Sequence, residues 1–137
     1  MSLEFAHSFV QFILERVSAM RDHRKLRAFE LADELVLMVY KATASFPRDE
    51  QFGLTSQLRR ACVSAASNIV EGSARNSQAD FVRFLDMAFG SLREAEYQVT
   101  IAARLQYMSE EESTSISDKA AETARVLAGL IRSLRDS

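Results

Sequence analysis

A chain of 137 residues is long enough for one domain with a buried core. With one proline, four glycines and almost no alternation of β-branched residues, its composition favours an all-α fold. The formal net charge of −2 excludes an overall basic field that would attract nucleic acid or anionic membranes, and a single cysteine excludes an intrachain disulfide.

The first predicted element is an amphipathic segment over residues 3–20. Its apolar residues recur at helical spacing: Ala6, Phe9, Val10, Ile13, Val17 and Met20. No apolar run in the chain approaches the roughly 20 residues of a membrane span, and no signal peptide opens it, so we expect a cytoplasmic protein. A charged break over 21–25 follows. We therefore predict an N-terminal helical extension, residues 1–25, that docks on a bundle domain of residues 26–137 or on a neighbouring subunit.

The second segment predicts a helix from about Arg27 to Ser45. The residues expected in the core are Leu31, Leu35, Met38, Val39 and Ala42. The residues expected in solvent are Glu30, Asp33, Glu34 and Lys41. Phe46-Pro47 should end this helix, because proline disfavours helical geometry in the residue before it. Asp49 or a neighbour is then expected to cap the next helix.

The third segment, residues 54–77, predicts a helix with two unlike faces. At about 100° per residue, one wide arc holds Leu54, Leu58, Ala61, Cys62, Val63, Ala65, Ala66, Ile69 and Val70. The other side holds Ser56, Gln57, Arg60, Ser64, Ser67, Asn68 and Glu71. Because the apolar arc exceeds the roughly 100° of a single packing contact, we expect burial on two sides and association of copies through this helix. Gly72 should end it in the left-handed conformation.

Two further helices complete the pattern. Ser77 is the expected N-cap of a helix over about 78–106, with core residues Phe81, Phe84, Leu85, Ala88, Leu92, Ala95, Val99, Ala102 and Ala103. Gly90 inside this helix costs up to roughly 1 kcal/mol against alanine, which suggests a close helix crossing. Ser109 and the acidic residues 110–112 begin the last helix, which runs to about Arg135. Its inward residues are Ile116, Ala120, Thr123, Leu127, Leu130, Ile131 and Leu134.

Four long helices joined by short turns predict an up-and-down four-helix bundle with an N-terminal helical extension. A distinctive motif runs through its middle: Phe46-Pro47, residues 54–61, Ser67-Asn68-Ile69 with Glu71-Gly72, Arg75, Phe81, and Gly90-Ser91 with Glu94. Over roughly residues 26–134 the chain resembles the four-helix bundle proteins called 23S rRNA intervening-sequence proteins. The resemblance implies a homopentamer. It also implies distant similarity to accessory proteins of diversity-generating retroelements, whose basic surfaces engage nucleic acid and a reverse transcriptase.

Four arginines are candidate nucleic-acid contacts: Arg59, Arg60, Arg75 and Arg93. A guanidinium group binds phosphate through paired hydrogen bonds, and a five-fold ring would repeat each arginine five times. The structural alternative is that Arg60 pairs with Glu71 or Glu94 and that Arg59 pairs across a subunit contact. We favour this structural alternative by roughly two to one, since structural ion pairs are commoner than binding sites. Two hypotheses follow: a non-enzymatic homo-oligomer that binds RNA or joins a nucleic-acid-processing protein, and a protein-interaction scaffold without nucleic acid.

Asn68, Glu71 and Glu94 form a candidate polar network. Metal sites in bundles usually use Glu-x-x-His pairs, and no histidine accompanies these carboxylates, so we expect neither metal nor cofactor. Cys62 falls in the apolar arc without a histidine at helical spacing, which predicts a buried, inert thiol. Since no catalytic constellation stands out, we do not expect an enzyme.

Overall fold

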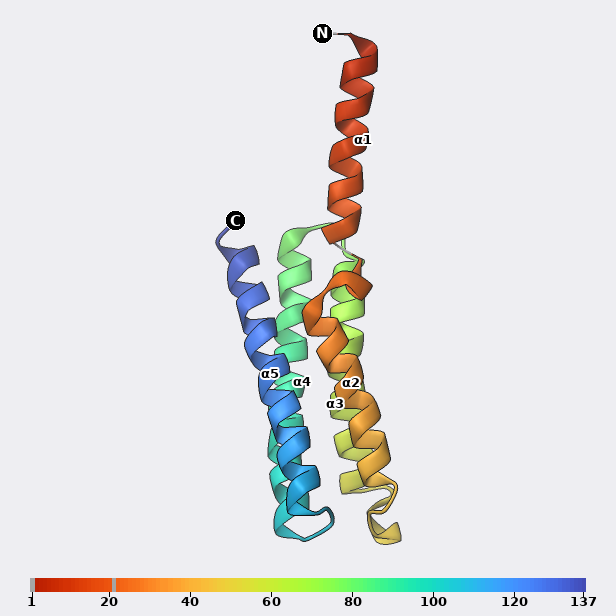
Figure 1. Ribbon diagram of the computed structural model, residues 1–137, viewed down its shortest axis with the longest axis vertical. Coiled ribbons are helices and arrows are strands. Elements are labelled where there is room, and N and C mark those ends of the chain that lie inside the picture. The colour runs from red at the N-terminus through yellow and green to blue at the C-terminus, as the bar shows by residue number, and fades with distance from the viewer. Residues whose placement is uncertain (1, 21) are drawn as a thin grey trace.

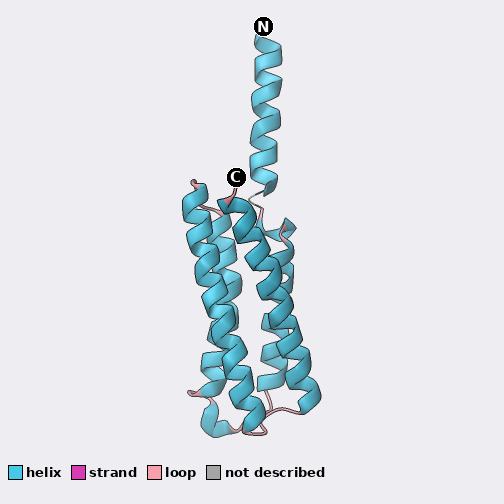
Figure 2. Ribbon diagram, turned by 90° about the vertical axis from the view of Figure 1, so that its left-hand side faces the viewer, coloured by secondary structure: helices cyan, strands magenta, loops and turns pink. Residues whose placement is uncertain are grey.

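The computed structural model describes residues 2–20 and 22–137, without the side chains of 12–20 and 25. It has five α-helices, α1 Leu3–Met20, α2 Arg27–Thr43, α3 Leu54–Ser73, α4 Gln78–Arg104 and α5 Glu110–Arg135, and two 3₁₀ turns, η1 His23–Lys25 and η2 Arg48–Glu50. Helices α2 to α5 run up and down side by side (Figures 1 and 2), which confirms the predicted all-α bundle with an N-terminal helix.

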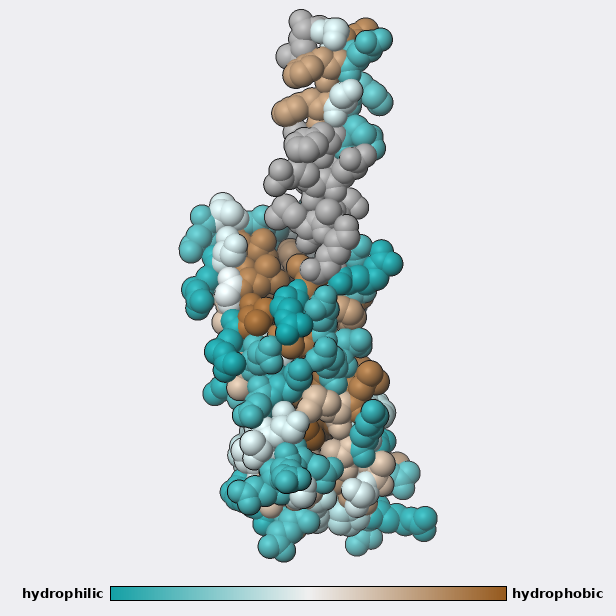
Figure 3. Space-filling view, viewed as in Figure 1, coloured by the Kyte–Doolittle hydropathy of each residue, from teal (hydrophilic) through white to brown (hydrophobic). Residues whose placement is uncertain are grey.

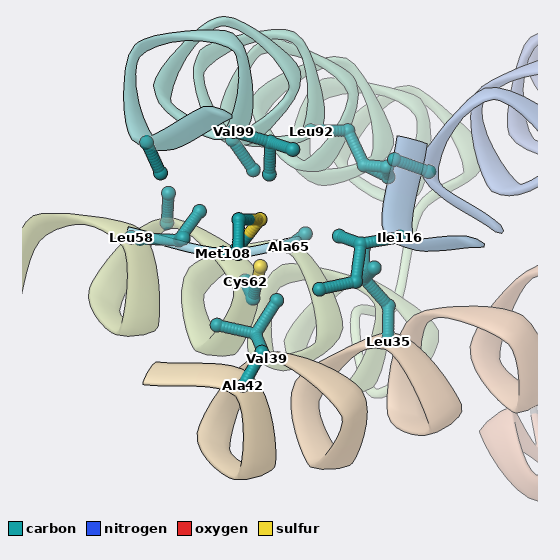
Figure 4. Close-up of a cluster of buried hydrophobic side chains, with 14 of the residues drawn as sticks. Leu35, Val39, Ala42, Leu58, Cys62, Ala65, Leu92, Val99, Met108 and Ile116 are labelled. Atoms are coloured by element: carbon teal, nitrogen blue, oxygen red, sulfur yellow. The ribbon is translucent and has the colours of Figure 1, made fainter. Parts of the chain in front are cut away.

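Each bundle helix packs against two neighbours, in the cyclic order α2, α3, α4, α5. This arrangement turns four apolar faces toward one centre, where Leu31, Leu85 and Leu127 are fully buried. Figure 4 shows the cluster nearer the α2–α3 and α4–α5 connections, in which Leu35, Cys62 and other side chains from four helices meet. The predicted inward faces of α2, α4 and α5 are confirmed. Polar residues cover most of the face seen in Figure 3, with an apolar area toward the end that carries α1.

Helix α1 extends beyond the end of the bundle (Figure 1) and, in the described part of the chain, contacts only η1. The prediction that it docks on its own bundle is therefore wrong, and Leu3, Phe5 and Phe9 are exposed. Asp22 caps η1, and the extended Leu26 leads from η1 into α2. Docking on a neighbouring subunit and the division at residue 25 stay predictions.

Side chains cap the helices close to where the sequence predicted. The Ser77 hydroxyl accepts a hydrogen bond from the Asp80 amide at 3.1 Å, and Ser109 forms a capping box with Glu112. Before α3, where Asp49 or a neighbour was expected to cap, the N-cap residue is Gly53, and the Oε1 of Glu50 accepts a hydrogen bond from the Leu54 amide at 3.3 Å.

Gly72 and Gly90, two of the three glycines inside long helices, have roles opposite to those predicted within the chain. Gly72 does not end α3 in a left-handed conformation, since no described glycine has a positive φ. It lies within α3 where α4 comes close: a Cβ added there would be 2.8 Å from the Phe84 Cβ and 3.1 Å from the Phe81 Cδ1. A Cβ added at Gly90 would meet nothing within 4 Å. The close crossing within the chain lies at Gly72, and no described helix of the same chain crosses at Gly90, which is on the outer side of α4.

Candidate functional site

The four candidate arginines lie on different sides of the bundle. Arg59 turns toward α2, where its Nε donates to the Thr43 Oγ1 at 2.8 Å and its guanidinium lies 4.5 Å from the centre of the Tyr40 ring. Arg75 lies at the α3–α4 turn, 4.5 Å from the centre of a phenylalanine ring. Arg93 forms an ion pair with Glu96 at 3.3 Å on the side of α4 that faces α5. One subunit therefore does not gather them into a basic cluster, and their role in binding nucleic acid stays a prediction.

Arg60 borders a polar groove between α3 and α4. A cavity of about 370 Å³ in this groove is lined by Gln57, Arg60, Ala61, Ser64, Ser91 and Glu94. The Arg60 side chain forms no hydrogen bond or ion pair with any residue that the structure describes, so the expected pairing with Glu71 or Glu94 does not occur within the chain. Its guanidinium keeps all its donors for water or for a partner.

The hydroxyl groups of Ser64 and Ser91, 2.9 Å apart, join α3 to α4 at the bottom of this groove. The Asn68 Nδ2 donates to the Ser64 carbonyl at 2.9 Å and to the Ser64 hydroxyl at 3.2 Å. Asn68 thus belongs to a polar network, whose serine members the sequence reasoning missed. Ser91 stands in the motif that carries the family resemblance, and this was the available signal.

Glu94 belongs to a second polar contact at the same groove. Its Oε1 accepts a hydrogen bond from the Nε2 of Gln98 at 3.1 Å. Gln98 is only 5% exposed, and its Oε1 has no partner among the described residues. A buried acceptor of this kind favours a bound water or a donor from outside the chain. Glu71 is exposed and joins neither network in the described structure, so the predicted three-residue network is split.

Cys62 is 1% exposed, and burial raises the pKa of its thiol to about 12. The thiol is therefore protonated near neutral pH, and a protonated thiol is a poor nucleophile and metal ligand. Among the residues that the structure describes, no group of three or more histidine, cysteine, aspartate or glutamate side chains is placed to hold a metal ion. The Cys62 thiol is therefore part of the core and not a candidate nucleophile.

The wide apolar arc of α3 is covered within one chain. Leu58, Cys62 and Ile69 are at most 1% exposed because α2 and α4 pack on them, which confirms burial on two sides. The arc therefore needs no second copy to cover it, since Val63, at 39%, is its only residue in the exposed class, and association of copies through this helix stays a prediction.

Exposed apolar side chains gather instead on two neighbouring surfaces. The surface that we name the α2/α3 face consists of Leu37, Tyr40, Arg59 and Val63. The surface that we name the α4 face consists of Met87, Gly90, Glu94 and Tyr97. Leu37 is 59% exposed and Tyr40 44%, while Met87 is 48% exposed and Tyr97 61%. Contiguous exposed apolar surfaces often mark interaction sites.

The family model described as 23S rRNA-intervening sequence protein matches residues 24–129. The chain belongs to this family. The family match begins in η1 and leaves α1 outside. Among solved structures, a protein with unknown function from the S23 ribosomal protein family of Bacteroides thetaiotaomicron is similar, with a TM-score of 0.69 and 25% sequence identity over 76% of this chain and 97% of that one. No curated protein matches the sequence significantly. No helix in the described part is long and apolar enough to cross a membrane.

Proposed function

We propose that this protein is a non-enzymatic subunit of a homo-oligomer, in which bundles associate through their outer faces. One observation carries the proposal: large apolar side chains are exposed on two neighbouring faces of a bundle whose interior is otherwise closed. Covering them gains roughly 25 cal/mol per Å² of apolar surface removed from water. The protonated, buried Cys62 thiol and the lack of a metal-binding cluster among the described residues agree with a binding role.

The expected size of the oligomer comes from the family resemblance, which implies a pentamer. Sedimentation velocity and native mass spectrometry of the full chain, over a wide range of concentration, test the proposal. We expect a single species whose mass is a small multiple of the chain mass. A well-folded monomer that persists at high concentration would overturn the proposal.

Nucleic-acid binding is the second candidate function, and a specific observation favours it. Arg60 is exposed and has no described partner, and it shares its groove with the amide of Gln57 and the hydroxyl of Ser91. These groups suit phosphate and base edges. Arg75 lies against the Phe84 ring at the end of the same helix pair. In an assembly, each of these groups would be repeated once per subunit.

A titration of single-stranded RNA against salt tests this second function. If phosphate contacts carry binding, affinity falls steeply as the salt concentration rises. Arg60→Ala should weaken binding and flatten its salt dependence, whereas Arg125→Ala, at an exposed position on α5, is the matched control. Absence of binding at low salt removes this candidate and leaves the assembly scaffold.

A further inference from the structure

We propose that the α2/α3 face of one copy docks on the α4 face of the next, with Arg59 of one subunit bound to Glu94 of the other and Leu37 packed over Gly90. This inference rests on the proposed assembly and names the two surfaces that form it. Four observations carry it: a glycine without a use inside the chain, opposite charges, matching levels along the bundle, and the angle between the faces.

Gly90 is a glycine that its own fold does not require. Glycine inside a helix is destabilising relative to alanine, and a Cβ at this position would meet nothing within 4 Å. Bare helix backbone lies exposed at Gly90, between Met87 about one turn before it and Tyr97 about two turns after it. A glycine at such a place permits close approach of another chain. The α4 face therefore has a shallow site for an apolar side chain, and Leu37 is the most exposed apolar residue of the α2/α3 face.

The two faces carry opposite charges that no described residue of the chain neutralises. Arg59 is held by the Tyr40 ring and the Thr43 hydroxyl, and it meets no carboxylate of the described residues. Glu94 binds the Gln98 amide and meets no described cation. Since the guanidinium of Arg59 is already positioned, docking costs it little side-chain entropy. A contact between guanidinium and carboxylate groups is a strong, oriented hydrogen-bonded pair.

The charged groups lie at nearly the same level along the bundle. The bond between Ser64 and Ser91 fixes one level common to α3 and α4. At about 1.5 Å per residue, Arg59 lies about 7.5 Å and Glu94 about 4.5 Å from this level, both toward the α2–α3 connection. Two copies that stand side by side and parallel, as subunits of a ring do, therefore bring the two residues within about 3 Å of the same height.

The same counting matches Leu37 with Gly90. The bond between Arg59 and Thr43 relates the levels of α3 and α2 to within the reach of the arginine side chain. Leu37 lies six residues before Thr43, about 9 Å toward the other end, which places it near the level of Ser91. Gly90 is one residue before Ser91, about 1.5 Å away along the helix, so Leu37 and Gly90 lie at similar heights. The charged pair and the apolar pair thus fit one parallel docking.

The two faces lie on adjacent sides of the bundle, one on each side of α3, because α2 and α4 are the two neighbours of α3. Adjacent sides of a four-helix bundle meet at roughly 90°. Contact between unlike faces is heterologous, and a ring closes with four copies when the two contact faces of a subunit meet at about 90° and with five when they meet at about 72°. The geometry therefore favours a small closed ring with α3 toward its centre.

Reversal of the two charges tests the docking. Arg59→Glu and Glu94→Arg should each raise the dissociation constant of the assembly at least about tenfold, because each places like charges together. The double variant carries the pair in swapped order at every interface and should restore assembly. Arg125→Glu on α5 is the control and should leave assembly unchanged. Circular dichroism checks that each variant is folded.

Crosslinking tests the partners of each face. Leu37→Cys and Gly90→Cys chains, co-expressed and treated with a short thiol crosslinker, should form a heterodimer, and neither chain alone should crosslink. A chain with both substitutions should give a ladder that ends at the ring size. The native Cys62 is buried and does not interfere. Self-crosslinking of Leu37→Cys alone would overturn the docking of unlike faces.

The failures of the two proposals are distinguishable. A monomeric wild-type protein would overturn the proposed assembly together with this docking. An oligomer that persists in both charge reversals and gives no heterodimer would overturn only the assignment of the faces. Restored assembly in the double variant would support the contact between Arg59 and Glu94, since general loss of charge or stability does not predict restoration.

Discussion

The surroundings of Gly72 and Gly90 differ more than their places in the sequence suggest. Both glycines lie inside long helices, and both stand in the motif shared with the family. Gly72 faces α4 at a distance that no side chain fits, since an added Cβ would lie 2.8 Å from the Phe84 Cβ. Gly90 faces outward with free space around it. One glycine lets two helices of the same chain meet, and the other leaves helix backbone bare at the surface.

This difference shows that a glycine inside a helix can mark a close approach of other atoms to the helix backbone. The sequence does not say whether those atoms belong to the same subunit or to another one. At Gly72 the approaching atoms belong to the same subunit, so the requirement is satisfied in the monomer. At Gly90 the described chain supplies no such atoms, and we assign the approach to Leu37 of a second copy. The contact at Gly72 should then control folding, while the contact proposed at Gly90 should control assembly. Five measurements test this separation.

The largest expected difference is in reactivity between two thiols, the native Cys62 on the buried side of α3 and a cysteine introduced at Gly90 on the outer side of α4. Burial raises the pKa of Cys62 to about 12 from a usual value of 9.0. The thiolate fraction is therefore about a thousandfold lower than that of an unperturbed thiol, apart from the steric protection. A maleimide should label Cys62 only after unfolding, whereas the new thiol in Gly90→Cys should react at once in the monomer and slowly in the assembly.

The raised pKa of Cys62 also fixes the sign of a pH effect. The folded state holds its thiol proton more tightly than the unfolded state, so the stability from this group is complete below about pH 9. It is lost as pH rises toward about 12, the pKa in the folded protein. Urea unfolding of the wild type and of Cys62→Ala over this range measures the difference. Rapid labelling of the native thiol at neutral pH would contradict its burial.

Gly72→Ala should give the largest change in folding stability among the glycine variants. The new Cβ must push apart α3 and α4 at a contact that includes the backbone oxygen of Phe81, 3.3 Å away. Overpacking of this kind costs about 1–3 kcal/mol, against a gain of up to about 1 kcal/mol in helix propensity. We expect a net loss of about 1–2 kcal/mol in urea unfolding. A more stable variant would show that the helices are farther apart than described.

Gly90→Ala should change folding stability in the opposite direction. Alanine meets no neighbour in the chain and gains about 0.5–1 kcal/mol of helix stability. Measurement in the Arg59→Glu background separates this gain from any effect on assembly. A larger residue in Gly90→Leu should keep the gain and dissociate the oligomer. If Gly90→Leu assembles as the wild type does, the bare backbone has no role in docking.

The same contrast explains how much of the fold could be predicted from sequence. The inward faces of α2, α4 and α5 follow from local spacing, because residues three and four apart share one side of a helix; Leu31 and Leu127 needed no other information. The roles of Gly72 and Gly90 depend on which side of each helix meets α3 or α4, and that orientation is set only when the bundle is packed. The path of α1 likewise depends on the turn at η1.

The candidate site shows the same limit. Arg59 and Arg60 are adjacent in sequence, yet one turns toward α2 and the other borders the α3/α4 groove. A step of about 100° around a helix separates them, so a pair in the sequence is not a pair in space. The bond between Arg59 and Thr43 spans 16 positions, and the sequence has no signal for it. The sequence identifies both arginines as candidates. Only the packing shows that Arg59 is held by α2, whereas Arg60 has no hydrogen-bond or ion-pair partner among the described residues.

The smallest expected effect belongs to an ion pair on the outside of the bundle, where Lys119 of α5 donates to Glu34 of α2 at 2.7 Å. The hydrogen bond from Lys119, together with its charge, lowers the pKa of Glu34 below its usual 4.5. The stability from this carboxylate is therefore present above about pH 4.5 and is lost as pH falls through the lower pKa of the folded state. Glu34→Gln should show a slightly weaker decline in urea-unfolding stability between neutral and acid pH than the wild type, because water screens an exposed pair. Glu34→Gln could instead lose as much unfolding free energy at neutral pH as Gly72→Ala does. The outer surface would then stabilise the monomer as strongly as the contact at Gly72, and the assignment of folding to the inner contact and assembly to the outer surface would be wrong.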